Sequence, residues 1–76
     1  MEISLTDLEI GKEGKIVRIE GGFGFKRRLR NVGLRENKII RKVASHPLNG
    51  PIVVEIDGRE ISIGRGMARK IFVEIK

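Results

Sequence analysis

GGFGFKRRLRNVGL, residues 21–34, is the stretch on which the rest of the chain depends. Three glycines in its first four residues lead into a helical pattern that closes at Gly33. On a helix, Phe25, Leu29 and Val32 fall on one face, at positions i, i+4 and i+7. Basic side chains take the opposite face. The stretch therefore predicts one short helix, over about residues 24–33, with an apolar face to bury and a positive face to display.

The segments on either side of this helix predict β-strands, because apolar residues alternate with polar ones. Five strands are expected, at residues 15–20, 38–45, 51–56, 59–63 and 71–75. Asp57-Gly58 predicts a two-residue type I′ hairpin turn between the third and the fourth strand. Since an open edge is a liability, we expect the last strand to pair beside the first and close a small barrel. The predicted fold class is all-β, with one inserted helix.

The alternation also predicts which side chains face the core. In the first strand we expect Val17 and Ile19 to point inward and Ile16 to point outward. Ser4 is expected to cap a short turn near the N-terminus. The remaining inward positions are predicted to be Leu5, Leu8, Ile10, Ile52, Val54, Ile56, Ile61, Ile63, Ile71, Val73 and Ile75.

Glycines at the chain reversals are expected to shape the turns, because glycine adopts positive φ without steric cost. We assign Gly22 and Gly24 to the entry into the helix. Gly33 suits the left-handed position after a helix, and Gly58 the second position of the hairpin turn.

Length and charge limit what the chain does. Its 76 residues predict a single domain, residues 1–76. The formal net charge is +6, and residues 26–42 alone hold eight basic residues and one acidic residue, which is +7. This basic segment predicts a binding face for an acidic protein, a phosphate or nucleic acid. The alternative is a solvated face that only keeps a small protein in solution.

Catalytic and cofactor chemistry find little support in the sequence. There is no cysteine and a single histidine, His46, so neither a metal site nor a nucleophile with its base is predicted. The glycines match no P-loop, and Arg27 stands where a dinucleotide fingerprint needs its third glycine. We predict a protein that is not an enzyme and holds no cofactor.

No apolar run is long enough to span a bilayer, and the N-terminus lacks the pattern of a signal peptide, so a cytoplasmic location is expected.

Three segments resemble the FeoA-type ferrous-iron-transport accessory proteins. They are GGxG followed by RRLxxVGL in residues 21–34, GPIVV at residues 50–54, and IGRGMARKIFV at residues 63–73. Their order and spacing cover nearly the whole chain. The sequence departs from the family where Leu-Gly-Leu is often followed by a Pro-Gly turn. Here Val32-Gly33-Leu34 is followed by Glu36-Asn37.

The resemblance implies an SH3-like barrel and a small cytoplasmic partner of FeoB, a membrane ferrous-iron transporter with a cytosolic GTPase domain. Such a protein would reach the inner membrane only through that partner. We predict that Arg27, Arg30, Leu34 and Arg35 contact the partner. The same barrel also occurs as a C-terminal domain of some metal-dependent repressors. The alternative hypothesis is therefore a small nucleic-acid-binding barrel that uses the basic face of residues 26–42.

Overall fold

The chain forms six short strands and three helices in the computed structural model, which describes residues 1–76. The strands are β1 (Glu2–Ser4), β2 (Glu13–Ile19), β3 (Ile39–Ser45), β4 (Ile52–Ile56), β5 (Arg59–Ile63) and β6 (Ile71–Ile75). The helices are the 3₁₀ turn η1 (Leu5–Asp7), α1 (Phe23–Asn31) and α2 (Arg65–Ala68). None of these helices is long and apolar enough to cross a membrane.

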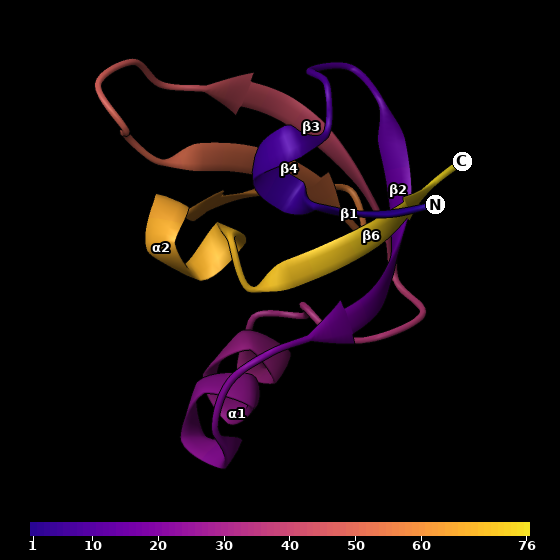
Figure 1. The fold of residues 1–76 in the computed structure, drawn as a ribbon, viewed down its shortest axis with the longest axis vertical. Helices are drawn as coiled ribbons and strands as arrows, with labels where there is room; N and C mark the ends of the chain where they lie inside the picture. Colours follow the sequence, from indigo (N-terminus) through magenta and orange to yellow (C-terminus); the bar gives the residue numbers. More distant parts are fainter.

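All strands join one antiparallel sheet in the order β1-β6-β2-β3-β4-β5. The predicted pairing of the last strand with the first long strand is confirmed as the β2–β6 ladder. The sequence predicted five strands and missed β1, which adds a sixth at the edge of β6. The order leaves β1 and β5 as two edges, so the strand pairing does not show the closed barrel that we expected. In Figure 1, α1 projects below the strands, and α2 lies between β5 and β6 in the chain.

Strand β4 and the hairpin after it follow the sequence prediction closely. Ile52, Val54 and Ile56 are all buried, as period-two alternation requires. The β4–β5 hairpin turns through Asp57 and Gly58, whose φ angles of 52° and 80° are those of a type I′ turn. This turn fixes the register in which β5 pairs with β4.

Strand β2 departs from the predicted alternation. Ile16 is buried and Val17 is half-buried, the reverse of the expectation. The register with β6 shifts between Ile16 and Arg18, where a β-bulge adds one residue. The bulge lets Ile16 and Ile19 face the core although they are three positions apart.

The core contains fourteen buried apolar side chains drawn from every part of the fold. Leu5 and Leu8 enter it from the N-terminal turn, which Ser4 caps by accepting a hydrogen bond from the Thr6 amide. Among the inward positions predicted outside β2 and α1, two are wrong: Ile10 is 59% exposed and Ile75, the last residue of β6, is 52% exposed.

Candidate partner-binding surface

Helix α1 is fixed to the domain by its apolar face and by its C-terminal turn. Leu29 is buried in the core and Phe25 packs against it. After the helix, the amide of Gly33 donates to the carbonyl of Arg30 at 3.0 Å, and the amide of Leu34 donates to that of Leu29 at 2.9 Å. These two bonds form a Schellman motif. The motif holds the helix against the sheet and directs the chain back into the core at Leu34.

The turn-shaping glycines are not equivalent in the structure. Gly33 has a φ of 95° and Gly58 a φ of 80°, so both occupy the left-handed region. Gly22 is the N-cap with a φ of −76°, and Gly24 lies inside α1, so neither needs the freedom of glycine. The entry into the helix is made instead at Gly21, with a φ of 133°. A Cβ atom there would lie 2.6 Å from Cδ2 of Phe25.

The exposed face of α1 carries arginines that form no ion pair. The four ion pairs of the protein involve none of Arg27, Arg28, Arg30 or Arg35. The guanidinium of Arg27 lies 5.9 Å from the ring centroid of Phe23, itself an exposed residue. Unpaired guanidinium groups keep their full capacity to bind carboxylates or phosphates from another molecule.

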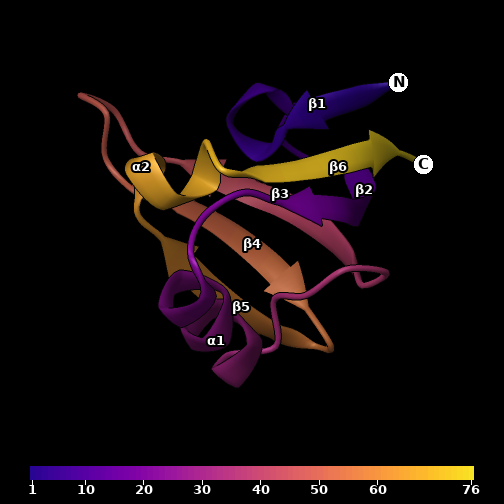
Figure 2. The ribbon, with the colours of Figure 1, turned by 60° about the horizontal axis from the view of Figure 1, so that its bottom comes forward.

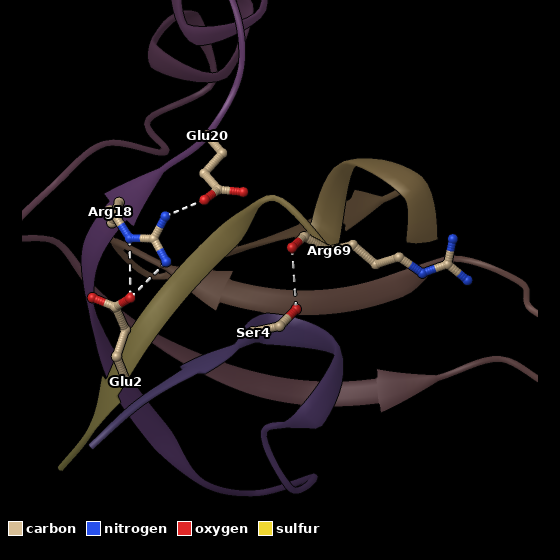
Figure 3. Close-up of polar contacts among 5 residues, drawn as sticks. All are labelled: Glu2, Ser4, Arg18, Glu20 and Arg69. Atoms are coloured by element: carbon tan, nitrogen blue, oxygen red, sulfur yellow. Dashed lines mark hydrogen bonds and ion pairs between the residues drawn. The ribbon is translucent and has the colours of Figure 1, made fainter.

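Arg18, in β2, shows the opposite situation (Figure 3). Its guanidinium donates to Glu2 at 2.7 Å and is also paired with Glu20. It lies over the ring of Phe72, 4.0 Å from the centroid. Hydrogen bonds to the two carboxylates raise the pKa of Arg18. An arginine held in this way contributes little to a binding face.

The basic segment of residues 26–42 is divided by the fold. Lys38 pairs with Asp57 at 2.9 Å and Arg41 with Glu55 at 2.7 Å, so both charges are partly neutralised. Lys42 is buried and donates to the main-chain carbonyl of Thr6 at 3.0 Å. The basic face that is free to bind therefore consists of the α1 arginines together with Arg35.

An apolar groove of about 350 Å³ lies beside this basic face, and residues of α1, β5 and α2 contribute to its lining. Figure 2 shows the arrangement of these three elements. It is lined by Arg28, Leu29, Asn31, Val32, Leu34, Ile61, Ser62, Ile63 and Met67. Leu34 is only 1% exposed and contributes to the inner wall of this groove. Contact between Leu34 and a partner would therefore require a partner side chain that enters the groove.

The sequence alone does not indicate the groove. Its walls come from segments far apart in the chain, and of the residues that line it only Leu34 was among the predicted partner contacts. Val32 was expected in the core but is 40% exposed at the groove mouth, because the helix ends one residue before it. Ile61 and Met67 are apolar side chains left partly uncovered by the packing of α1 and α2.

The surface offers binding and no evident covalent chemistry. No three His, Cys, Asp or Glu side chains lie close enough together to hold a metal ion. His46 is exposed in the loop between β3 and β4, away from the groove-lining residues. Arginines without ion pairs, an apolar groove and a helix on a small sheet are features typical of a small binding domain.

The chain belongs to the FeoA family, because the FeoA domain matches residues 3–75. This family comprises non-enzymatic accessory proteins of ferrous-iron transport. The match confirms the resemblance that the three sequence segments indicated.

Two relatives support the assignment. A Methanocaldococcus jannaschii protein named "Putative Fe(2+) transport protein A" is 36% identical over 70 residues, which cover 88% of this chain and 83% of that protein. A Porphyromonas gingivalis protein named "Fe(2+) transport protein A/Fe(2+) transporter FeoB fusion protein" is 35% identical over 71 residues. That match covers 93% of this chain but only 8% of the much longer fusion protein.

Solved structures share the fold over almost the full chain. A crystal structure of an iron uptake regulatory protein, FeoA, superposes with a TM-score of 0.90 at 29% identity, covering 100% of this chain and 99% of that one. The solution structure of FeoA from Chlorobium tepidum gives a TM-score of 0.87 at 26% identity, with 96% of this chain and 70% of that one covered. A manganese-dependent transcriptional repressor also matches, with a TM-score of 0.90 at 24% identity, over 99% of this chain and 42% of the repressor. At that identity the repressor shares the fold alone.

Proposed function

We propose that this protein binds the cytosolic portion of a FeoB-type ferrous-iron transporter and modulates its activity. The observation that carries the proposal is the Porphyromonas gingivalis relative, in which a sequence like this one is fused to FeoB in one polypeptide. Two proteins that act together are often found joined in this way. The protein would act in the cytoplasm and reach the inner membrane through this contact.

The basic face and the apolar groove support a docking role. Arg27, Arg30 and Arg35 are exposed and form no ion pair, so their charge is available to acidic side chains of a partner. The groove adds apolar surface next to these charges. This arrangement resembles a protein interface, in which an apolar centre is surrounded by polar groups. The six-stranded sheet would then act as a rigid support for α1.

The test measures binding to the full-length FeoB-type transporter in detergent. The double variant Arg27→Glu/Arg30→Glu should weaken binding by about tenfold or more, because two attractive contacts become repulsive. The matched control Lys12→Glu/Lys15→Glu makes the same change in net charge on exposed residues outside the groove, and should bind almost as the wild type does. Equal affinity of the α1 variant and the wild type would show that the wrong face has been assigned.

Modulation is measured with the same proteins. The wild-type domain should change the rate of GTP hydrolysis or of iron transport by the transporter, and the α1 variant should lose that effect.

A titration of duplex DNA at two salt concentrations tests the alternative function, since binding through phosphates falls steeply as salt rises. Tight, salt-dependent DNA binding without transporter binding would favour the nucleic-acid hypothesis.

A further inference from the structure

Strand β5 has a free edge that faces away from β4. Ile56 and Arg59 flank a two-residue turn, so Arg59, Ile61 and Ile63 direct their main-chain groups toward β4. In an antiparallel ladder the residues between them, Glu60 and Ser62, direct their amide and carbonyl groups to the opposite side. No other main-chain hydrogen bond involves Glu60 or Ser62. This edge therefore presents unused donors and acceptors.

The free edge of β5 borders the apolar groove. Ser62 lines the groove together with Ile61 and Ile63 of the same strand. Arg28 and Asn31 of α1 form the opposite wall, and Figure 2 shows α1 lying beside β5. The groove therefore combines an open strand edge with a lining that is mostly apolar.

The charges around the groove are unevenly distributed. The guanidinium of Arg59 donates to the carbonyl of Val32 at 2.8 Å and ties the hairpin to the end of α1. Glu60, an exposed carboxylate, is the next residue along β5. On the α1 side the groove is lined by Arg28, which forms no ion pair. Acidic groups of a ligand are favoured along α1 and disfavoured near Glu60.

We propose that this groove binds an extended acidic segment of the partner protein, which adds to the sheet as a strand beside β5. Main-chain hydrogen bonds to Ser62 would supply the pairing, and an aliphatic or aromatic side chain of the segment would enter the groove. Carboxylates on the segment would meet Arg28, which lines the groove. This inference rests on the proposed function, since it names the part of the transporter that the domain recognises.

The lining of the groove favours a peptide over nucleic acid. Ile61, Ile63 and Met67 offer no flat aromatic ring on which a base could stack. Phosphate contacts would engage only the arginines and would leave the apolar wall and the strand edge unused. A peptide uses all three features at once.

The test uses Ser62→Pro, which removes the outward-facing amide while the side chain stays on the exposed edge. Proline at this position should lower the affinity for the full-length transporter in detergent by about tenfold or more. The control Ser62→Thr keeps the amide and should bind within about twofold of the wild type. Hydrogen exchange at the Ser62 amide should slow by about tenfold or more in the wild-type complex.

A second pair of variants tests the groove without changing the strand. Val32→Glu places a carboxylate at the groove mouth, and Ile39→Glu places the same charge at a residue of similar exposure, 43% against 40%, away from the groove-lining set. Only Val32→Glu should weaken binding.

Full binding by Ser62→Pro and Val32→Glu would overturn the strand-addition model and leave the proposed function intact. Failure of the wild type to bind the transporter would overturn both the strand-addition model and the proposed function. DNA binding that needs the arginines but is unchanged in Ser62→Pro would also overturn the strand-addition model.

Discussion

The ammonium group of Lys42 donates a hydrogen bond to the main-chain carbonyl of Thr6 at 3.0 Å, across 36 residues of sequence. A second, longer contact of 3.4 Å reaches the carbonyl of Leu5. Lys42 thereby ties η1 to the centre of β3. It is the one charged side chain that the fold buries.

Lys42→Met should destabilise the protein by about 1–3 kcal/mol, because the carbonyl of Thr6 loses its donor while it remains partly buried. Urea denaturation at neutral pH measures the change. Lys12→Met, at an exposed lysine, serves as the control and should stay within about 0.5 kcal/mol of the wild type. An unchanged midpoint for Lys42→Met would mean that relief of the buried charge fully offsets the lost hydrogen bond.

The same lysine predicts a dependence of stability on alkaline pH. Burial, and then the positive charge of Arg65, lower the pKa of Lys42 below its ordinary value of 10.5, while Asp7 opposes the shift. Between the lowered pKa and 10.5 the unfolded chain holds more protons than the folded chain, so the free energy of unfolding rises with pH in this window. Wild-type protein should show this rise relative to Lys42→Met. Parallel curves for the two proteins would contradict it.

Two glycines near α1 should respond to alanine in opposite directions. Gly21→Ala should cost on the order of 2 kcal/mol, because an L residue is strained at a positive φ and its Cβ would collide with the ring of Phe25. Gly24→Ala should stabilise the protein by up to about 1 kcal/mol, since a Cβ there meets no atom within 4 Å and alanine favours the helix. Thermal unfolding of both variants checks the prediction. Equal destabilisation by Gly21→Ala and Gly24→Ala would contradict the positive φ described for Gly21.

The hairpin carboxylate predicts an effect in acid. A hydrogen bond from Lys38 lowers the pKa of Asp57 below its ordinary value of 3.8. The ion pair therefore stabilises the protein above pH 3.8 and is lost as the pH falls through the lowered pKa. Asp57→Asn keeps a turn sequence suited to type I′ and removes the ion pair, so the free energy of unfolding should fall less steeply as the pH is lowered. The difference should be small, because the pair is exposed. Acid unfolding curves of the two proteins make the comparison.

The sequence predicted those parts of the fold that local patterns control. The alternation of Ile52, Val54 and Ile56 and the Asp57-Gly58 turn were correct because each depends on neighbouring residues. In β2 the prediction was correct for Ile19 and wrong for Ile16 and Val17, because a bulge between Ile16 and Arg18 breaks the period of two. Strand β1 was missed because its three residues form a strand only through pairing with β6.

The candidate surface was predicted in part for the same reason. The arginines of α1 follow from the helical period, and their freedom from ion pairs depends on where the acidic residues lie in the fold. Lys38 and Lys42 looked equally available in the sequence, yet one is paired and the other buried. The groove joins α1 to β5 and α2, and no local pattern connects these segments.

The short strand β1 shields the outer edge of β6, where Ile3 faces Val73 in the ladder. Proteolytic trimming of the first four residues would remove that shield and the cap of η1 together. A five-residue strand would then lie bare, ready to pair with strands of other molecules. Preparations of this domain that lose their N-terminus during purification should for that reason be prone to precipitate.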